Sequence, residues 1–175
     1  MIFQLCFFLI LSLFSWEIES YGRVWEPVHR GSAWRKGFPT PINYEDNMNQ
    51  CGGFVTLHYK NGGRCGICGD DFASSTPRDN ENKGKYGTGT IVQKYQANQT
   101  IDVEVELTAN LDSNVIGMLN FKVNLPKKLT CEQCVFRWQY TAANNWGICP
   151  DGTGALGCGP QETFRTCSDV QIVKK

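Results

Sequence analysis

Cysteine content is the feature that most constrains how this chain can fold. Cys6 lies in an apolar leader, and the other eight cysteines are Cys51, Cys65, Cys68, Cys131, Cys134, Cys149, Cys158 and Cys167. An even number of cysteines in an oxidising compartment predicts four disulfides, with on the order of 100 pairings open. Zinc binding by the two Cys-x-x-Cys pairs is the alternative, but these pairs lie farther apart than in a zinc ribbon.

The N-terminal residues predict export from the cell. Residues 2–14 are almost wholly apolar, and no Lys or Arg precedes them. A membrane span takes roughly 20 residues, whereas this run suits the centre of a secretory signal peptide. Cleavage after the small residue Ser20 would start the mature chain at Tyr21. We therefore expect a signal peptide over residues 1–20, no membrane anchor and a secreted, extracellular protein. A buried core helix is the alternative.

The remaining residues, 21–175, are enough for one domain with a real core. The whole chain has 17 basic and 17 acidic residues, and it contains no block of Lys or Arg. Nucleic acid is therefore not an expected partner. We expect a monomeric single-domain protein.

Alternation of apolar and polar residues predicts an all-β fold. The pattern is clearest over residues 100–108, where Ile101, Val103, Val105 and Leu107 point to one side. Weaker alternation predicts strands over residues 53–60, 90–95, 119–125, 136–140 and 169–174. Residues 21–50 are predicted to be an irregular arm, and residues 61–87 a long loop. Short half-buried strands separated by turn residues favour a β-sandwich.

Several short motifs have an ordinary structural interpretation. Residues 152–157 match the string GxGxxG, but they lie between two cysteines and not between a strand and a helix, so we expect a loop. His58, Glu104 and Glu106 fall on polar strand faces, where solvated side chains are expected. Asn98 begins the single N-glycosylation sequon, just before the clearest strand.

Aromatic residues in the early arm suggest a binding surface. Trp25, Trp34, Phe38 and Tyr44 alternate with prolines, which stiffen a segment without regular structure. Aromatic rings held on a rigid surface offer apolar faces on which flat sugar rings can lie. Tyr44 is followed by Glu-Asp-Asn and is the residue most expected to be exposed. We therefore single out Tyr44 as a candidate polysaccharide-binding residue.

A series of motifs along the chain resembles one family. The motifs are residues 21–27 (YGRVWEP), 34–44 (WRKGFPTPINY), 51–54 (CGGF), 65–70 (CGICGD), 101–110 (IDVEVELTAN), 131–135 (CEQCV), 145–147 (NWG) and 157–170 (GCGPQETFRTCSDV). In this order they resemble the chitin-binding type-4 domain of animals. This domain is that of the lytic polysaccharide monooxygenases of auxiliary-activity family fifteen.

The resemblance implies an immunoglobulin- or fibronectin-III-like sandwich with long disulfide-tied loops over residues 21–175. It also implies a copper site, the histidine brace, formed by the amino group and imidazole of an N-terminal His and by a second His. An aromatic ring fills an axial position. Imidazole and amine nitrogens suit copper, and the exposed metal cuts chitin or cellulose oxidatively.

The sequence departs from the family where this chemistry is carried out. Tyr21 stands where the N-terminal His is expected, and Leu111 stands where the second His follows Thr-Ala-Asn. The segment after Leu111 is also several dozen residues shorter than in the family. Phe164 keeps the axial aromatic position, and Glu162 keeps the carboxylate that supports it.

These departures predict a secreted protein that binds chitin or a related polysaccharide, with no catalytic residues and no copper cofactor. Two alternatives stay open. The first is an active copper-dependent polysaccharide monooxygenase represented here by a truncated or variant sequence. The second is a secreted structural or ligand protein that reuses the scaffold.

Overall fold

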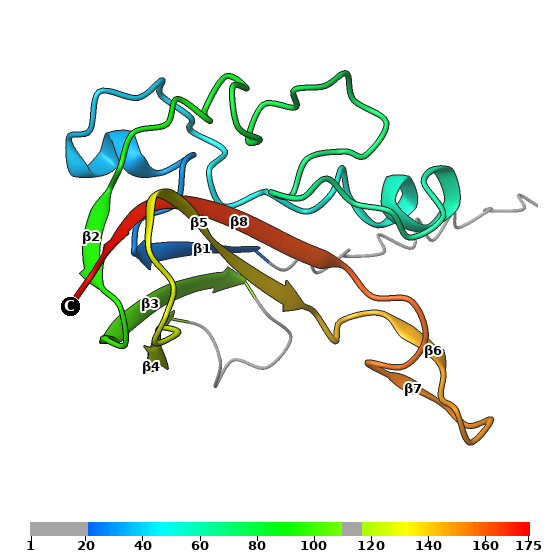
Figure 1. Cartoon of the computed structure of the whole chain (residues 1–175). Coiled ribbons are helices and arrows are strands. Elements are labelled where there is room, and N and C mark those ends of the chain that lie inside the picture. The colour runs from blue at the N-terminus through cyan, green and yellow to red at the C-terminus, as the bar shows by residue number, and fades with distance from the viewer. Residues whose placement is uncertain (1–20, 110–116) are drawn as a thin grey trace, which may run out of the picture.

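The chain forms two small β-sheets that face each other in the computed structural model, which describes residues 21–109 and 117–175 (Figure 1). The predicted signal peptide and Leu111 lie outside the described residues. The strands are β1 (Tyr21–Glu26), β2 (Gln93–Gln96), β3 (Thr100–Ala109), β4 (Gly117–Asn124), β5 (Cys131–Thr141), β6 (Trp146–Ile148), β7 (Gly154–Leu156) and β8 (Thr163–Val173). A 3₁₀ helix, η1 (Ala33–Lys36), and a π-helix, η2 (Thr56–Lys60), complete the described elements.

The two sheets have simple strand orders. The first sheet runs β1–β3–β4 and is antiparallel throughout. The second runs β2–β8–β5, with β2 parallel and β5 antiparallel to the central strand β8. Strands β6 and β7 form a separate antiparallel hairpin. This arrangement confirms the predicted all-β sandwich.

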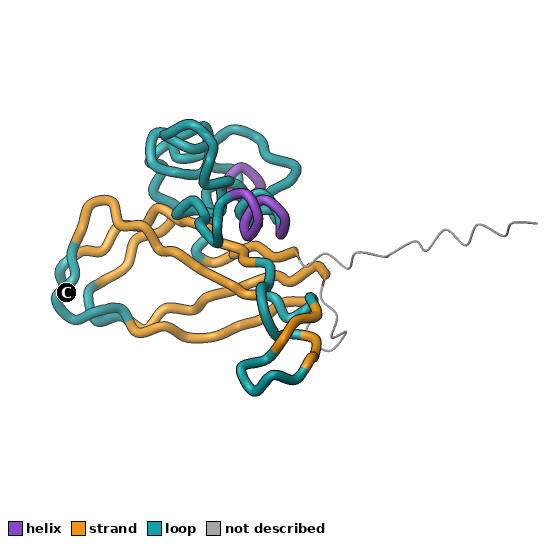
Figure 2. Tube along the Cα trace, turned by 90° about the vertical axis from the view of Figure 1, so that its right-hand side faces the viewer, coloured by secondary structure: helices purple, strands orange, loops and turns teal. Residues whose placement is uncertain are grey.

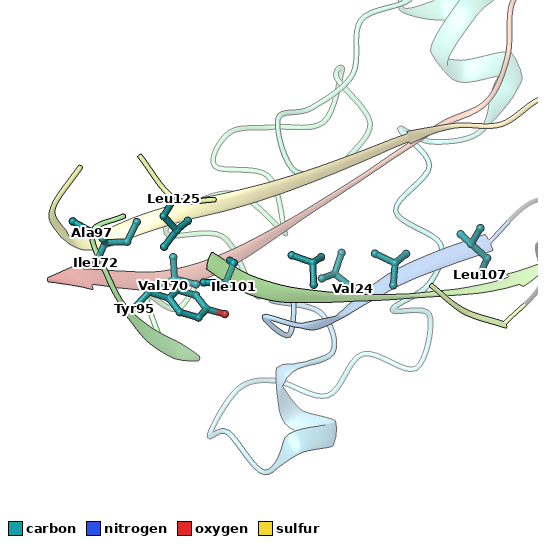
Figure 3. Packing of buried hydrophobic residues seen from close by; sticks show 10 residues of the cluster. Val24, Tyr95, Ala97, Ile101, Leu107, Leu125, Val170 and Ile172 are labelled. Carbon is teal, nitrogen blue, oxygen red and sulfur yellow. The ribbon is translucent and has the colours of Figure 1, made fainter. Parts of the chain in front are cut away.

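The core lies between the two sheets, and β3 contributes more residues to it than any other strand. Ile101, Val103, Val105 and Leu107 are all buried, as the period-two pattern of this strand predicts. They pack with Val24 of β1 and with Tyr95, Val170 and Ile172 of the second sheet (Figure 3). The apolar side of β3 therefore selects which faces of the two sheets meet.

A layer of loops covers the outer face of the second sheet. Most of the segment between β1 and β2 lies on one side of the strands (Figure 2). It is attached to β8 by the Cys68–Cys167 disulfide and by the ion pair between Arg30 and Asp169, whose N–O distance is 2.7 Å. Strand β8 is consequently buried on both faces, so its sequence lacks clear alternation.

All eight cysteines of the described residues form disulfides, as predicted. The pairs are Cys51–Cys65, Cys68–Cys167, Cys131–Cys134 and Cys149–Cys158. The two Cys-x-x-Cys pairs therefore behave differently: one bridges its own two cysteines, and the other links to two distant segments. With every sulfur in a disulfide, the zinc alternative is excluded for these cysteines.

The prediction of a strand over residues 53–60 is wrong. Gly52 and Gly53 have φ of 84° and 87°, which turns the chain before this segment. Leu57 then donates to the carbonyl of Gly53, and Asn61 donates to that of Thr56, both at 2.9 Å. The segment satisfies its backbone locally and forms η2, with only Leu57 buried. Among the described residues, no partner strand lies beside it to complete a sheet.

Three further expectations need correction. Residues 21–26 form a strand because the edge of β3 pairs with them, and the buried positions Gly22 and Val24 supply a weak alternation. Strand β8 begins six residues earlier than predicted, at Thr163. Residues 152–157 include β7 and are not simply a loop. Within the described ranges, no helix has the length and apolar character needed to cross a membrane.

The buried Arg30–Asp169 pair should be important for stability. Removing one partner leaves an uncompensated buried charge, so Asp169→Asn should lower the free energy of unfolding by roughly 3 kcal/mol. The exposed Lys122–Asp102 pair provides the control, because Lys122→Ala should cost less than about 1 kcal/mol. Chemical denaturation measures both. Equal, small losses in the two variants would contradict the role of the buried pair.

Candidate functional site

The candidate site is built around the start of β1. Tyr21 is half-buried and pairs with Ala109 of β3, two residues before Leu111, which lies outside the described residues. A register irregularity separates Tyr21 from Gly22. A Cβ atom at Gly22 would lie 2.8 Å from Leu107 Cδ2 and 3.3 Å from Trp138 Cη2. A larger residue here would require Leu107 to shift, so the start of β1 packs closely against Trp138 of the second sheet.

Phe164 lies in the second sheet and belongs to a row of aromatic rings. It is fully buried, and its ring centroid is 6.2 Å from that of Tyr140 on the neighbouring strand. Tyr140 stacks in parallel on Trp138, with centroids 5.9 Å apart. The row therefore extends from Phe164 to the ring that contacts Gly22. This places the predicted axial residue and the start of β1 at neighbouring parts of the sandwich.

Glu162 lies two residues before Phe164 and is largely buried. Its Oε2 accepts a hydrogen bond from Asn144 Nδ2 at 3.1 Å, and its backbone carbonyl accepts one from the amide of Ala142 at 2.9 Å. The carboxylate is thus held in place by its neighbours. Glu162 is close to Phe164 in the sequence, but its hydrogen bonds are to the segment that follows β5.

Tyr44 is strongly exposed, as predicted, with 78% of its surface accessible. Its ring packs edge-on against Trp34, with centroids 5.5 Å apart. Trp34 is held in turn by a hydrogen bond from its Nε1 to the carbonyl of Asn43 at 3.1 Å and by the Arg35 guanidinium over its ring. Tyr44 is therefore an exposed ring that packs against a tryptophan held in a fixed position.

Asp46 holds the loop that carries Tyr44. It is fully buried and accepts hydrogen bonds from Ser32, Arg23 and Arg35 at 2.6–2.8 Å. Burial tends to raise the pKa of Asp46, but the hydrogen bonds from Arg35 and Ser32 and the charge of Arg23 lower it overall. Asp46 itself is enclosed by two arginines and a serine, whereas Tyr44 two residues before it is exposed as predicted.

The same network connects the Tyr44 loop to strands β1 and β3 of the first sheet. Arg23 also donates to Glu106 of β3 at 2.6 Å, and Glu106 accepts a second bond from Trp25 Nε1 at 3.0 Å. Asn47 Nδ2 donates to Thr108 Oγ1 at 3.2 Å. Glu106 is therefore half-buried and structural, where a solvated side chain was expected. The Tyr44 loop and the Tyr21 end of β1 form one connected surface region.

The two histidines make their side-chain hydrogen bonds with residues other than Tyr21. His29 is fully buried, and its Nε2 lies 2.6 Å from Ser32 Oγ. Because Ser32 Oγ donates to Asp46, it accepts from His29, which fixes the proton on Nε2 and leaves Nδ1 without a partner. His58 lies on η2 and not on a strand face as predicted. Its Nε2 lies 2.8 Å from the carbonyl of Gln161, so it acts as a donor there.

The donor atoms at this place do not fit the copper brace that the resemblance implies. Tyr21 supplies a phenol in place of an imidazole, and Phe164 has no donor atom. In the part of the chain that the structure describes, no cluster of three or more His, Cys, Asp or Glu side chains is arranged to hold a metal ion. A copper site of this kind needs nitrogen donors. The side-chain hydrogen bonds of both histidines are to residues other than Tyr21.

Other exposed aromatic residues were missed by the sequence analysis. Tyr59 on η2 and Trp146 on β6 are exposed, and Tyr59 packs near Phe54, with ring centroids 6.1 Å apart. Asn98 is exposed in the turn between β2 and β3, at a φ of 64°. An open pocket of about 570 Å³ lies next to Asn98, at the end of β3 opposite Tyr21.

Comparison with known proteins gives the family. The chain is similar to a lytic polysaccharide monooxygenase AA15 from Thermobia domestica, in the Cu(I) state, with a TM-score of 0.80 and 33% identity. The similarity covers 86% of this chain and 98% of that one. A family model described as lytic polysaccharide mono-oxygenase, cellulose-degrading, matches residues 112–170. No curated protein sequence matches. The chain belongs to the AA15 family of lytic polysaccharide monooxygenases.

Burial of His29 should make the protein sensitive to mild acid. Burial, together with the charges of Arg23 and Arg35, lowers the pKa of His29 from 6.5 to about 4. The unfolded chain therefore takes up this proton first, and acidification favours unfolding between pH 6.5 and 4. The free energy of unfolding should fall by about 3 kcal/mol across this window.

Denaturant titrations at several pH values measure this loss. The matched control is His58→Gln, which removes the other histidine and should keep the full dependence on pH. His29→Asn should flatten the curve if the variant folds. A wild-type free energy of unfolding that stays constant between pH 6.5 and 4 would show that His29 does not titrate as a buried neutral side chain.

Proposed function

We propose that this protein is a secreted, monomeric polysaccharide-binding member of the AA15 family that does not carry out copper-dependent oxidation. Its ligand is chitin or a related insoluble glycan. The predicted signal peptide over residues 1–20 and the general export of family members support secretion. The exposed sequon at Asn98 supports glycosylation on the secretory route.

The observation that carries the proposal is the supported exposure of Tyr44. An aromatic ring that remains 78% exposed while its edge packs on Trp34 can lie against the C–H face of a sugar without first being ordered. The buried Asp46 network fixes the loop below it. Stacking of this kind involves little charge, which suits a neutral crystalline polysaccharide.

The absence of oxidative activity is proposed from the donor chemistry. A phenol at Tyr21 cannot form the chelate of an N-terminal histidine, and Leu111 offers no donor atom. Loss of even a residue that only orients a metal ligand costs roughly 10–100-fold in affinity. Loss of two ligands should therefore leave copper bound weakly, if it binds through the remaining amine at all.

A second candidate is an active monooxygenase whose natural sequence differs from this one near Leu111. It is favoured by the 33% identity to a protein in the Cu(I) state, and by the retention of Phe164 and Glu162. The two candidates differ in the residue that follows Asn110 in the transcript. Sequencing the transcript across codons 105–125 separates them directly.

Binding to insoluble polysaccharide tests the role of Tyr44. The wild type should pellet with chitin, and its retention should survive high salt because the contact is not electrostatic. Tyr44→Ala should weaken retention roughly tenfold. Tyr44→Phe keeps the ring and should retain most of the binding. Unchanged retention of Tyr44→Ala, or a wild type that pellets with no polysaccharide, would contradict the proposal.

Copper titration tests the proposed loss of the brace. The mature wild type should show no tight one-to-one Cu(II) site by calorimetry, and its paramagnetic resonance spectrum should lack several nitrogen couplings. The double variant Tyr21→His, Leu111→His restores both ligand positions and should bind Cu(II) far more tightly. Oxidised oligosaccharides released by the wild type from chitin or cellulose with a reductant would instead support the active-enzyme alternative.

A further inference from the structure

The β6–β7 hairpin projects from the sandwich and is fastened at its base (Figure 1). The Cys149–Cys158 disulfide joins the turn end of β6 to the segment that follows β7. Gln161 holds the base: its Nε2 donates to the carbonyls of Asn145 at 2.9 Å and Cys158 at 2.7 Å, and its Oε1 accepts from the Asn145 amide. Such a short hairpin would not be stable alone, so these bonds give it a defined position.

One face of this hairpin is apolar and open to solvent. Trp146 pairs with Leu156, and Ile148 pairs with Gly154, so all four positions lie on the same face. The exposed fractions are 65% for Trp146, 62% for Leu156 and 57% for Ile148. None of these three side chains belongs to the core cluster, so folding of the sandwich does not explain why they are apolar.

The absence of a side chain at Gly154 leaves space for the indole ring of Trp146. A Cβ atom at Gly154 would be only 2.2 Å from Trp146 Cζ2, and within 3.1 Å of two further atoms of the same ring. The ring therefore occupies the space above the glycine, against the hairpin backbone. We call Trp146, Ile148 and Leu156, seated on Gly154, the Trp146 platform.

We propose that the Trp146 platform is a second sugar-stacking site for neutral polysaccharide, separate from Tyr44. The inference rests on the proposed binding function and adds a contact that Tyr44 does not supply. A broad ring backed by glycine presents one flat apolar face, to which the C–H face of a pyranose ring is complementary. An aromatic side chain offers a large apolar contact area and loses little conformational entropy when a ligand binds.

The low charge of the hairpin favours a neutral ligand. Between residues 142 and 160 the only charged side chain is Asp151. Its Oδ1 accepts hydrogen bonds from the amide and hydroxyl of Thr153 at 2.9 and 2.7 Å, inside the turn of the hairpin. Asp151 in the turn is therefore the one charge that this segment offers, and the three side chains of the platform carry none. An uncharged glycan such as chitin or cellulose matches it.

The size of the platform argues against a second copy of this chain as its occupant. A standard protein interface buries roughly 800 Å² on each partner. Three side chains on two three-residue strands offer much less than this. Two or three sugar rings, by contrast, need only a few aromatic or aliphatic side chains.

Pull-down with insoluble chitin and cellulose tests the platform. Trp146→Ala should reduce retention several-fold, whereas Trp146→Phe should keep part of it. Gly154→Val retains the tryptophan but places a branched side chain where the ring lies, so it should reduce retention as Trp146→Ala does. The matched control is Leu129→Ala, an exposed apolar residue in the turn between β4 and β5, which should bind like the wild type. Peptide mapping of the Cys149–Cys158 disulfide verifies the hairpin in each variant.

The outcomes separate this inference from the proposed function. If the wild type is retained and Tyr44→Ala weakens retention, but Trp146→Ala and Gly154→Val do not, the platform is overturned and the proposed function stands. If the wild type is retained by neither polysaccharide, both fail. If Trp146→Ala leaves retention unchanged but converts a dimer to a monomer in sedimentation, the platform is a self-association surface and the inference is wrong.

Discussion

The attachment of the loop layer to β8 is the constraint on which the rest of the structure depends. Arg30 and Asp169 form a nearly fully buried ion pair, and the Cys68–Cys167 disulfide joins the same two parts of the chain across 99 positions. Removal of either partner of such a buried pair would leave an uncompensated charge in the interior. A disulfide that closes a long loop mainly restricts the unfolded chain. Together they fix irregular segments that have no sheet of their own.

A second buried charge organises the surface that binds ligand in our proposal. Asp46 is enclosed by Ser32, Arg23 and Arg35, and Arg23 extends the network to Glu106 on β3. The loop that carries Tyr44 is thereby tied to the first sheet. The aromatic row from Phe164 to Trp138 approaches the same strand from the second sheet, at Gly22. Both sheets thus approach each other closely at the start of β1.

The exposed aromatic residues share one structural principle. Tyr44 leans on Trp34, and Trp146 lies over Gly154 on a hairpin closed by a disulfide. In each case a ring is held in place by buried or covalent support while its outer surface stays open. Rings that are ordered before binding lose little entropy when a ligand arrives. In our proposal, rings ordered in this way bind the flat surface of a neutral polysaccharide.

The sequence alone determined the all-β class, because the alternation over β3 is strict, and it determined that the cysteines pair, because their number is even and the leader is apolar. It also predicted the exposure of Tyr44, which the structure confirms. Only the tertiary structure decided the π-helix at Thr56–Lys60, the burial of Asp46 and the extent of β8. The physical reason is that each depends on whether another part of the chain supplies a partner. A segment forms a strand only beside a free edge, Asp46 is buried because arginines enclose it, and alternation disappears where both faces of a strand are covered.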